Sequence, residues 1–310
     1  MLDHILVPLD GSIQSESILP HLRRLAQLGA REITLLRADL PVAVDAYSLL
    51  CEAAQNRARE YLRCVRTRLA DLRIHCQILS RIGPPARTIL EVAQEQGATV
   101  ILMSTQPRGA IARWLFGSIS EHVLQASPIP VIIVPPMWSY DLAPADPSGL
   151  RPVQRILVPV DGSELGVPAL LGAVGLAQKF QARIHLLHVR PSRYPAGTPG
   201  GVDDPGEEDS ADATAEKMRE AWLRCAAAGV ETHQRVESGE VVPQILKVAR
   251  DGGMDWIAMA THPRRGLARW LTGSITEHVL REVGIPMLVV PMTSGPRSRP
   301  SLMHHLSTRT

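Results

Sequence analysis

Short apolar runs alternate with longer stretches of helical spacing along the first half of the chain. The runs lie at Ile5–Leu9, Ile33–Leu36, Cys76–Leu79, Val100–Met103 and Val131–Val134. Because they lack polar alternation, they predict strands that are covered on both faces. Between them, apolar residues recur every three or four positions and predict helices near residues 18–26, 58–72, 85–93 and 118–125. This order predicts an α/β fold, Rossmann-like and doubly wound, with a five-stranded parallel sheet.

The second half of the chain repeats the first. Ile5–Ser12 recurs as Ile156–Ser163, and Trp114–Leu124 recurs as Trp270–Leu280. Each copy is long enough to enclose its own core, so the repeat predicts two tandem domains and not a solenoid. Composition places domain 1 at residues 1–136, a Pro- and Ala-rich linker at 137–152, domain 2 at 153–292 and a disordered tail at 293–310.

Charge and composition exclude several classes of protein. The 310 residues carry 33 Lys+Arg against 31 Asp+Glu and only 4% aromatic residues, which argues against a nucleic-acid partner. No apolar run approaches the roughly 18 residues of a membrane span, and the N-terminus lacks a basic leader, so we expect no membrane contact and a cytoplasmic protein. Four cysteines without a CxxC pair predict reduced, mostly buried thiols, and no metal site is predicted.

Polar residues follow the first strand of each copy. In an open parallel sheet, ligands bind at the carboxyl ends of the strands, where the strand order reverses. Pro8 and Asp10 in the first copy, and Pro159 and Asp161 in the second, follow strand one. A carboxylate there can accept a hydrogen bond from a ribose hydroxyl or help to hold a cation. The alternative is that Asp10 and Ser12 only cap the first helix.

A second candidate feature follows strand four. The loop after this strand ends in Gly117-Ser118 and in Gly273-Ser274, each at the predicted start of a helix. The pattern Ser118-x-x-Glu121 is a capping box, which predicts a helix N-terminus at that serine. Free N–H groups and the positive end of a helix dipole favour a phosphate. The alternative is an ordinary capped helix without a ligand.

Three motifs together resemble the universal stress protein family over nearly the full length of each half. They are I-L-V-P-x-D-G-S, the strand-four loop with R-W-L-x-G-S-I-x-E-H-V-L, and the final Ile129–Pro135 and Ile285–Pro291. The resemblance implies an adenine nucleotide alpha hydrolase-like fold that binds ATP or another adenine nucleotide, with Mg²⁺ where the nucleotide carries it. It places these residues at the nucleotide: Pro8, Asp10, Ala38, Met103, Ser104, Arg108, Gly117, Ser118 and Ile119 in domain 1, and Pro159, Asp161, Val189, Met259, Ala260, Arg264, Gly273, Ser274 and Ile275 in domain 2.

The strand-four loop departs from the nucleotide-binding pattern of the family, G-x2-G-x9-G-(S/T). Its first two glycines are replaced in both copies, the second of them by Pro107 and Pro263. Proline has no N–H, so each loop has one phosphate donor fewer, which costs about 1 kcal/mol or more. Arg108 and Arg264 follow directly and could replace the amide by bidentate contact. The alternative is that both arginines are solvated loop charges.

Two functions fit these features. The first is a stress-response protein that binds an adenine nucleotide, with domain 2 expected to retain the site better because Leu187-His188-Val189 is more typical of the family than Leu36-Arg37-Ala38. The alternative is a dimerisation and partner-docking module whose phosphate loops are degraded by Pro107 and Pro263. The enzyme question stays open, with slow ATP hydrolysis at most, because the chain has no P-loop and no G-x-S-x-G.

The last strand of each copy has a separate role. Val131–Val134 and Met287–Val290 are expected at a sheet edge, where an apolar strand tends to pair with another. The resemblance implies pairing of these strands across a pseudo-twofold axis. We therefore expect an intramolecular pairing of the two domains through the terminal strands, and a further homodimer is left open.

Overall fold

A computed structural model describes most of both halves of the chain. The described residues are 1–40, 47–105, 118–135, 151–163, 166–190, 211–261 and 275–292. Residues 136–150, which include most of the predicted linker, and the predicted tail at 293–310 lie outside them.

Domain 1 alternates strands and helices in the predicted order. Its elements are β1 (His4–Pro8), α1 (Ile13–Glu16), α2 (Leu19–Gln27), β2 (Glu32–Asp39), α3 (Tyr47–Arg68), a 3-10 turn (Ala70–Leu72), β3 (His75–Ile82), α4 (Pro85–Glu95), β4 (Val100–Ser104), α5 (Ser118–Ala126) and β5 (Val131–Val134). The first predicted helix is observed as α2, preceded by the single turn α1. Pro20 lies in the first turn of α2. Backbone N–H groups in the first turn have no acceptor within the helix, so a proline there removes no helical hydrogen bond.

Domain 2 repeats the same alternation of strands and helices. Its elements are β6 (Arg155–Pro159), α6 (Val167–Phe180), β7 (Arg183–Arg190), α7 (Ala211–Ala227), β8 (Thr232–Ser238), α8 (Val241–Asp251), β9 (Trp256–Thr261), α9 (Ile275–Glu282) and β10 (Met287–Pro291). Among the described residues, α6 is the helix between β6 and β7, where domain 1 has α1 and α2, and no 3-10 turn is described between α7 and β8.

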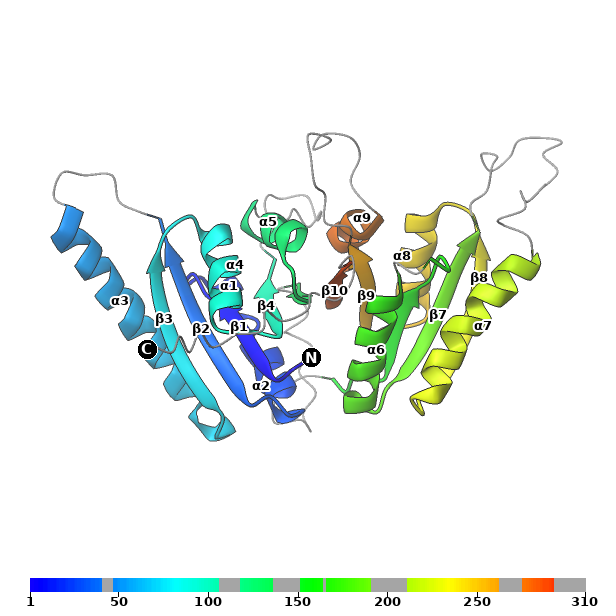
Figure 1. The fold of residues 1–310 in the computed structure, drawn as a ribbon, viewed down its shortest axis with the longest axis horizontal. Helices are drawn as coiled ribbons and strands as arrows, with labels where there is room; N and C mark the ends of the chain where they lie inside the picture. Colours follow the sequence, from blue (N-terminus) through cyan, green and yellow to red (C-terminus); the bar gives the residue numbers. More distant parts are fainter. Residues whose placement is uncertain are drawn as a thin grey trace, which may run out of the picture.

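The strands form one ten-stranded sheet in the order β3-β2-β1-β4-β5-β10-β9-β6-β7-β8 (Figure 1). The strands within each half are parallel, which confirms the predicted fold class. The terminal strands are paired with each other: β5 runs antiparallel to β10, with Ile132 opposite Leu288. Each is the edge strand of its own half, as predicted, and their pairing places both at the centre of the ten-stranded sheet.

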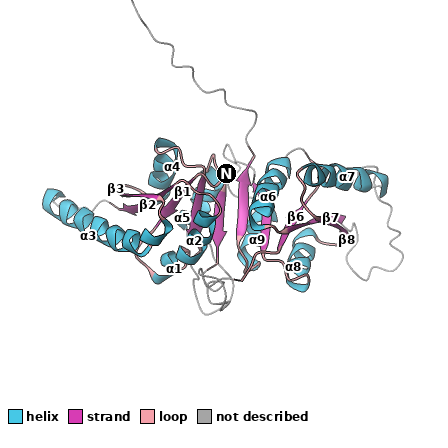
Figure 2. Cartoon of the chain, turned by 90° about the horizontal axis from the view of Figure 1, so that it is seen from below, coloured by secondary structure: helices cyan, strands magenta, loops and turns pink. Residues whose placement is uncertain are grey.

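Helices cover both faces of the sheet in both halves (Figure 2). Because side chains alternate along a strand, each face has its own core. One core packs α2, α3, α6 and α7 against residues such as Ile5, Ile132 and Leu288. The other packs α4, α5, α8 and α9 against residues such as Leu6 and Val289. Both cores extend through both domains, so the central strand pair is an interior part of the fold.

Polar contacts add to the joint between the domains. Lys179 Nζ on α6 donates to the carbonyl oxygen of Leu28 at 2.6 Å. On the other face, Gln125 Nε2 on α5 donates to Glu277 Oε1 on α9 at 3.4 Å. The helices α5 and α9 are thus neighbours across the centre of the molecule, as Figure 1 shows.

Two further expectations can be compared with the described residues. None of the helices described is long and apolar enough to cross a membrane. Cys225 is buried and Cys76 is half-buried, but Cys64 is exposed on α3, so the expectation of mostly buried thiols is wrong for that residue. Burial raises the pKa of the Cys76 thiol to about 11.

Candidate functional site

A cleft of about 310 Å³ opens at the carboxyl ends of β1, β2 and β4 in domain 1. It is closed by the first turns of α4 and α5. Seven of the predicted site residues line it: Pro8, Asp10, Ala38, Met103, Ser104, Ser118 and Ile119. The other two, Arg108 and Gly117, lie outside the described residues. The strand order thus brings together residues that are more than 100 positions apart.

The lining of the cleft is divided in chemical character. Its apolar lining includes Leu36, Ile89 and Met103, which also belong to the core on that face. Its polar lining includes Asp10, Asp39, Ser104, Ser118 and Ser120. An apolar slot beside carboxylates and hydroxyl groups suits a ligand with a flat apolar part and a polar part.

The sequence did not identify every residue of the cleft. Asp39, Leu40, Pro85 and Ile89 also line it. Pro85 stands at the start of the helix after strand three, which is a signal that sequence reasoning could have used. Asp39 was missed because it lies beyond the predicted end of strand two at Leu36, whereas β2 continues for three more residues.

The loop after β1 is held by Asp10. Its Oδ1 accepts hydrogen bonds from the Ser12 backbone N–H at 2.8 Å and from Ser12 Oγ at 2.6 Å. Ser12 Oγ in turn accepts from the Ser15 backbone N–H at 3.1 Å and is the N-cap of α1. Gly11 between them has a φ of +79°, a conformation that L side chains rarely adopt. Asp10 therefore fixes the loop, and Ser12 caps the helix.

Domain 2 repeats the hydrogen bonds of this loop. Asp161 Oδ1 accepts from the Ser163 N–H at 2.9 Å and from Ser163 Oγ at 2.7 Å. Gly162 has a φ of +78°. However, α6 begins later, at Val167, with Gly166 as its N-cap and no side-chain capping bond. The helix-capping interpretation of this motif thus holds for Ser12 in domain 1, whereas residues 164–165, which follow Ser163 in domain 2, lie outside the described residues.

The environment of Asp10 favours its charged form. Burial alone raises the pKa of this carboxyl, but the hydrogen bonds from Ser12 and Ser15 and the charge of Arg37 outweigh burial and lower the pKa below its usual range. The cleft therefore presents a carboxylate at neutral pH.

This lowered pKa predicts a pH dependence of stability. A carboxyl whose pKa is lower in the folded state stabilises the protein above its unfolded pKa of about 3.9, and this contribution disappears as the pH falls through the folded pKa. We expect Asp10→Asn, which keeps the acceptor oxygen, to lower stability at pH 7. The urea unfolding curves of variant and wild type should converge below about pH 4. A constant difference between pH 2 and 7 would contradict this expectation.

The helix N-terminus predicted beside the cleft is present. Helix α5 begins at Ser118, and Ser118, Ile119 and Ser120 all line the cleft. The first N–H groups of a helix have no partner within it and lie at the positive end of the helix dipole, so this N-terminus favours an anion. In domain 2, α9 begins at Ile275, and Thr276 Oγ1 donates to the Ala260 carbonyl oxygen at 2.7 Å, which ties the helix to the end of β9.

The other domain 2 residues predicted for the site are divided between described and undescribed parts. Pro159 is the last residue of β6, and Val189 is the last but one of β7. Met259 and Ala260 lie near the end of β9. Arg264, Gly273 and Ser274 lie outside the described residues, as do Pro107 and Pro263. The predicted site of domain 2 therefore stays a prediction.

Arg37 links the end of β2 to the loop after β1. Its Nη1 donates to the Asp10 carbonyl oxygen at 2.7 Å, and its Nε donates to Asp39 Oδ1 at 2.9 Å. The guanidinium also lies over the Tyr61 ring, 5.7 Å from its centre. This arginine, which makes strand two atypical in sequence, thus holds two carboxylate-bearing segments of the cleft together.

A model of the universal stress protein family matches residues 1–135 and 152–291. The chain belongs to the universal stress protein family. A universal stress protein of Mycolicibacterium smegmatis is 25% identical over 298 residues, which span 92% of this chain and 96% of that protein. One from Methanocaldococcus jannaschii is 28% identical over 144 residues, covering 44% of this chain and 81% of that protein. Two universal stress protein domains therefore stand in tandem.

Solved structures of universal stress proteins share the fold across both halves. One from Archaeoglobus fulgidus superposes with a TM-score of 0.76 at 23% identity and covers 94% of this chain and 100% of that chain. One from Pseudomonas aeruginosa gives a TM-score of 0.66 at 19% identity and covers 94% of this chain and 93% of that chain. At these identities the likeness concerns the fold alone.

Proposed function

We propose that this universal stress protein binds an adenine nucleotide, ATP or another, in the cleft of domain 1 and acts in the stress response as a nucleotide-dependent binding protein. One observation carries the proposal. A carboxylate after β1, an apolar slot and a helix N-terminus converge on a single cleft of about 310 Å³. Those are the three parts that a ribose, a base and a phosphate require.

Each part of a nucleotide has a complementary part of the cleft. The apolar residues Leu36, Ala38 and Ile89 offer a surface for the base. Asp10 lies in the loop after β1, where its carboxylate can accept hydrogen bonds from ribose hydroxyl groups. Ser118 begins α5, and the positive end of the helix dipole there favours a phosphate. This assignment agrees with what the family resemblance implies for the same positions.

The residues of the cleft also bear on Mg²⁺ and on hydrolysis. Mg²⁺ is commonly held by nucleotide phosphates together with one or two carboxylates, and Asp10 could supply one. The three lysines of the chain, Lys179, Lys217 and Lys247, all belong to domain 2, so a lysine-assisted phosphoryl transfer has no candidate in domain 1. We therefore propose binding without efficient turnover.

We propose that the pairing of β5 with β10 supplies within one chain the contact that the family resemblance implies between two domains. The antiparallel register of Ile132 with Leu288 and the two shared cores support this. Covalent linkage keeps the partner domain at a high effective concentration. The expectation that domain 2 also binds nucleotide, and better than domain 1, belongs to the same proposal.

Calorimetric titration of the full chain with AMP, ADP and ATP tests the proposal. We expect binding that Asp10→Ala weakens about tenfold, because a charge-assisted hydrogen bond to the ribose is lost. Asp71→Ala is the control, since Asp71 is an exposed carboxylate paired with Arg23 outside the cleft. Absence of heat with all three nucleotides would refute the proposal and favour the partner-docking alternative.

A further inference from the structure

The two domains carry opposite charges at the end of their second strand. Asp39 is the last residue of β2, and Arg190 is the last residue of β7. Their backbones are equivalent. The Gly83 N–H donates to the Asp39 carbonyl oxygen at 2.9 Å, and the Gly239 N–H donates to the Arg190 carbonyl oxygen at 2.9 Å. A hydrogen-bond acceptor in domain 1 is therefore replaced by a hydrogen-bond donor in domain 2.

Asp39 is an acceptor with spare capacity. It lines the cleft, and its side chain is 29% exposed. Arg37 Nε donates to both carboxylate oxygens, at 2.9 Å to Oδ1 and 3.2 Å to Oδ2, which fixes the group in place. A carboxylate has about four acceptor sites, so these bonds leave some of them for a ligand.

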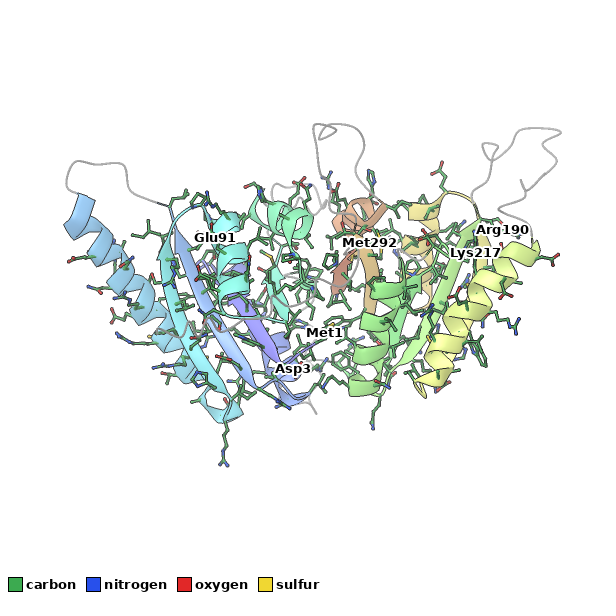
Figure 3. All side chains as sticks on the ribbon, in the orientation of Figure 1. Met1, Asp3, Glu91, Arg190, Lys217 and Met292 are labelled. Atoms are coloured by element: carbon green, nitrogen blue, oxygen red, sulfur yellow. The ribbon has the colours of Figure 1, made fainter. Side chains whose placement is uncertain are left out.

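Arg190 offers only donors. Its Nη2 donates to Ser238 Oγ at 3.3 Å, and its Nε is buried and has no hydrogen-bond partner in the described part of the chain. Figure 3 shows Arg190 and Lys217 near the carboxyl end of β7. The Lys217 side chain packs against Gly162, whereas the Arg37 guanidinium and the Tyr61 ring lie near the equivalent Gly11 in domain 1. The end of β7 thus presents a cationic hydrogen-bond donor where the end of β2 presents a carboxylate.

We propose that the two domains select different purine bases, with Asp39 and Arg190 as the residues that determine the choice. The inference rests on the proposed function, which places the base at the end of the second strand. The Asp39 carboxylate accepts from the 6-amino group of adenine. The Arg190 guanidinium donates to an acceptor at the same position, as in a 6-oxopurine, whose O6 and N7 arginine contacts bidentately. Domain 1 is then an aminopurine site and domain 2 an oxopurine site.

Three probes separate these preferences in the full chain. They are AMP, purine riboside 5′-monophosphate, which lacks only the 6-amino group, and IMP, which carries a 6-oxo group. By titration calorimetry we expect one site to bind AMP at least about tenfold more tightly than the purine riboside nucleotide, because a site built to hydrogen-bond a group rejects an analogue without it. A second site should prefer IMP to AMP.

Two variants assign the sites to the domains. Asp39→Ala should remove the discrimination between AMP and the purine riboside nucleotide and leave IMP binding unchanged. Arg190→Ala should weaken IMP about tenfold and leave AMP binding unchanged. Matched controls exist at the opposite ends of the same strands, Glu32→Ala on β2 and Arg183→Ala on β7, and should change neither preference. Thermal unfolding of each variant checks that it is folded.

The outcomes distinguish this inference from the function on which it rests. If AMP binds but the purine riboside nucleotide binds equally well, or if Asp39→Ala leaves their ratio unchanged, base selection by Asp39 is wrong and nucleotide binding stands. If a variant at Arg190 leaves the IMP affinity unchanged, the oxopurine assignment of domain 2 is wrong. If the wild type binds none of the three, the proposed function and this inference are both refuted.

Discussion

Leu288→Ala is expected to lower the free energy of unfolding of the whole chain by about 2–5 kcal/mol, the usual cost of a cavity at a buried leucine. Leu288 lies on β10 opposite Ile132 of β5 and has no exposed surface. Leu288 also packs against α6 at Gly172. A Cβ atom added to this glycine would lie only 3.0 Å from Leu288 Cδ2. The cavity would therefore open where both domains and a covering helix meet.

Urea unfolding followed by circular dichroism measures this effect, and Leu171→Ala is the matched control. Leu171 lies on α6 with 54% of its surface exposed, so its truncation should change stability by less than about 0.5 kcal/mol. Two separate unfolding transitions in the wild type, with only the second shifted by Leu288→Ala, would show that the shared cores do not couple the domains. A single transition that shifts as a whole is the expected result.

Ser118→Glu is expected to weaken the proposed nucleotide binding to domain 1 about a hundredfold or more, because a carboxylate at the start of α5 would face the phosphate of a nucleotide bound as proposed. The same change should leave the helix as stable as before or slightly more stable, since a negative charge is favourable at a helix N-terminus. Binding and stability are thus expected to respond in opposite directions, which separates loss of the site from loss of the fold.

The control for this variant is His122→Glu, one turn further along the same helix. His122 is exposed and does not line the cleft. Affinity for AMP, measured by calorimetry, should change by less than about twofold through long-range charge alone at physiological salt. Equal losses of affinity in both variants would mean that the start of α5 is not where the phosphate binds.

The sequence predicted those parts of the fold that depend on buried side chains. Val131–Val134 is observed with the predicted bounds, and Val100–Met103 differs by one residue. Strand β2 is longer than its apolar run, because Arg37 and Ala38 pair with Ser80 and Arg81 through the backbone alone. Apolar patterns report which side chains are buried and contain no information on a backbone ladder that continues beyond them.

The same distinction explains which site residues could be predicted. Asp10 and Ser118 follow from strand order, because residues after strands one and four of a doubly wound sheet lie at one edge. Asp39 and Ile89 line the cleft because the folded chain places them beside it. No local sequence motif identifies either residue. The Arg37 contact with the Asp10 carbonyl oxygen likewise depends on a side-chain conformation that only the folded chain defines.

The antiparallel pair β5–β10 joins two halves that are encoded separately. In an assembly of two identical chains, every substitution occurs twice, so both sites must tolerate it at once. In this chain a substitution occurs once, so Asp39 and Arg190 can occupy equivalent positions without either being imposed on the other half. A symmetric sheet can thus carry two sites that change independently, while the strands at its centre must remain complementary to each other.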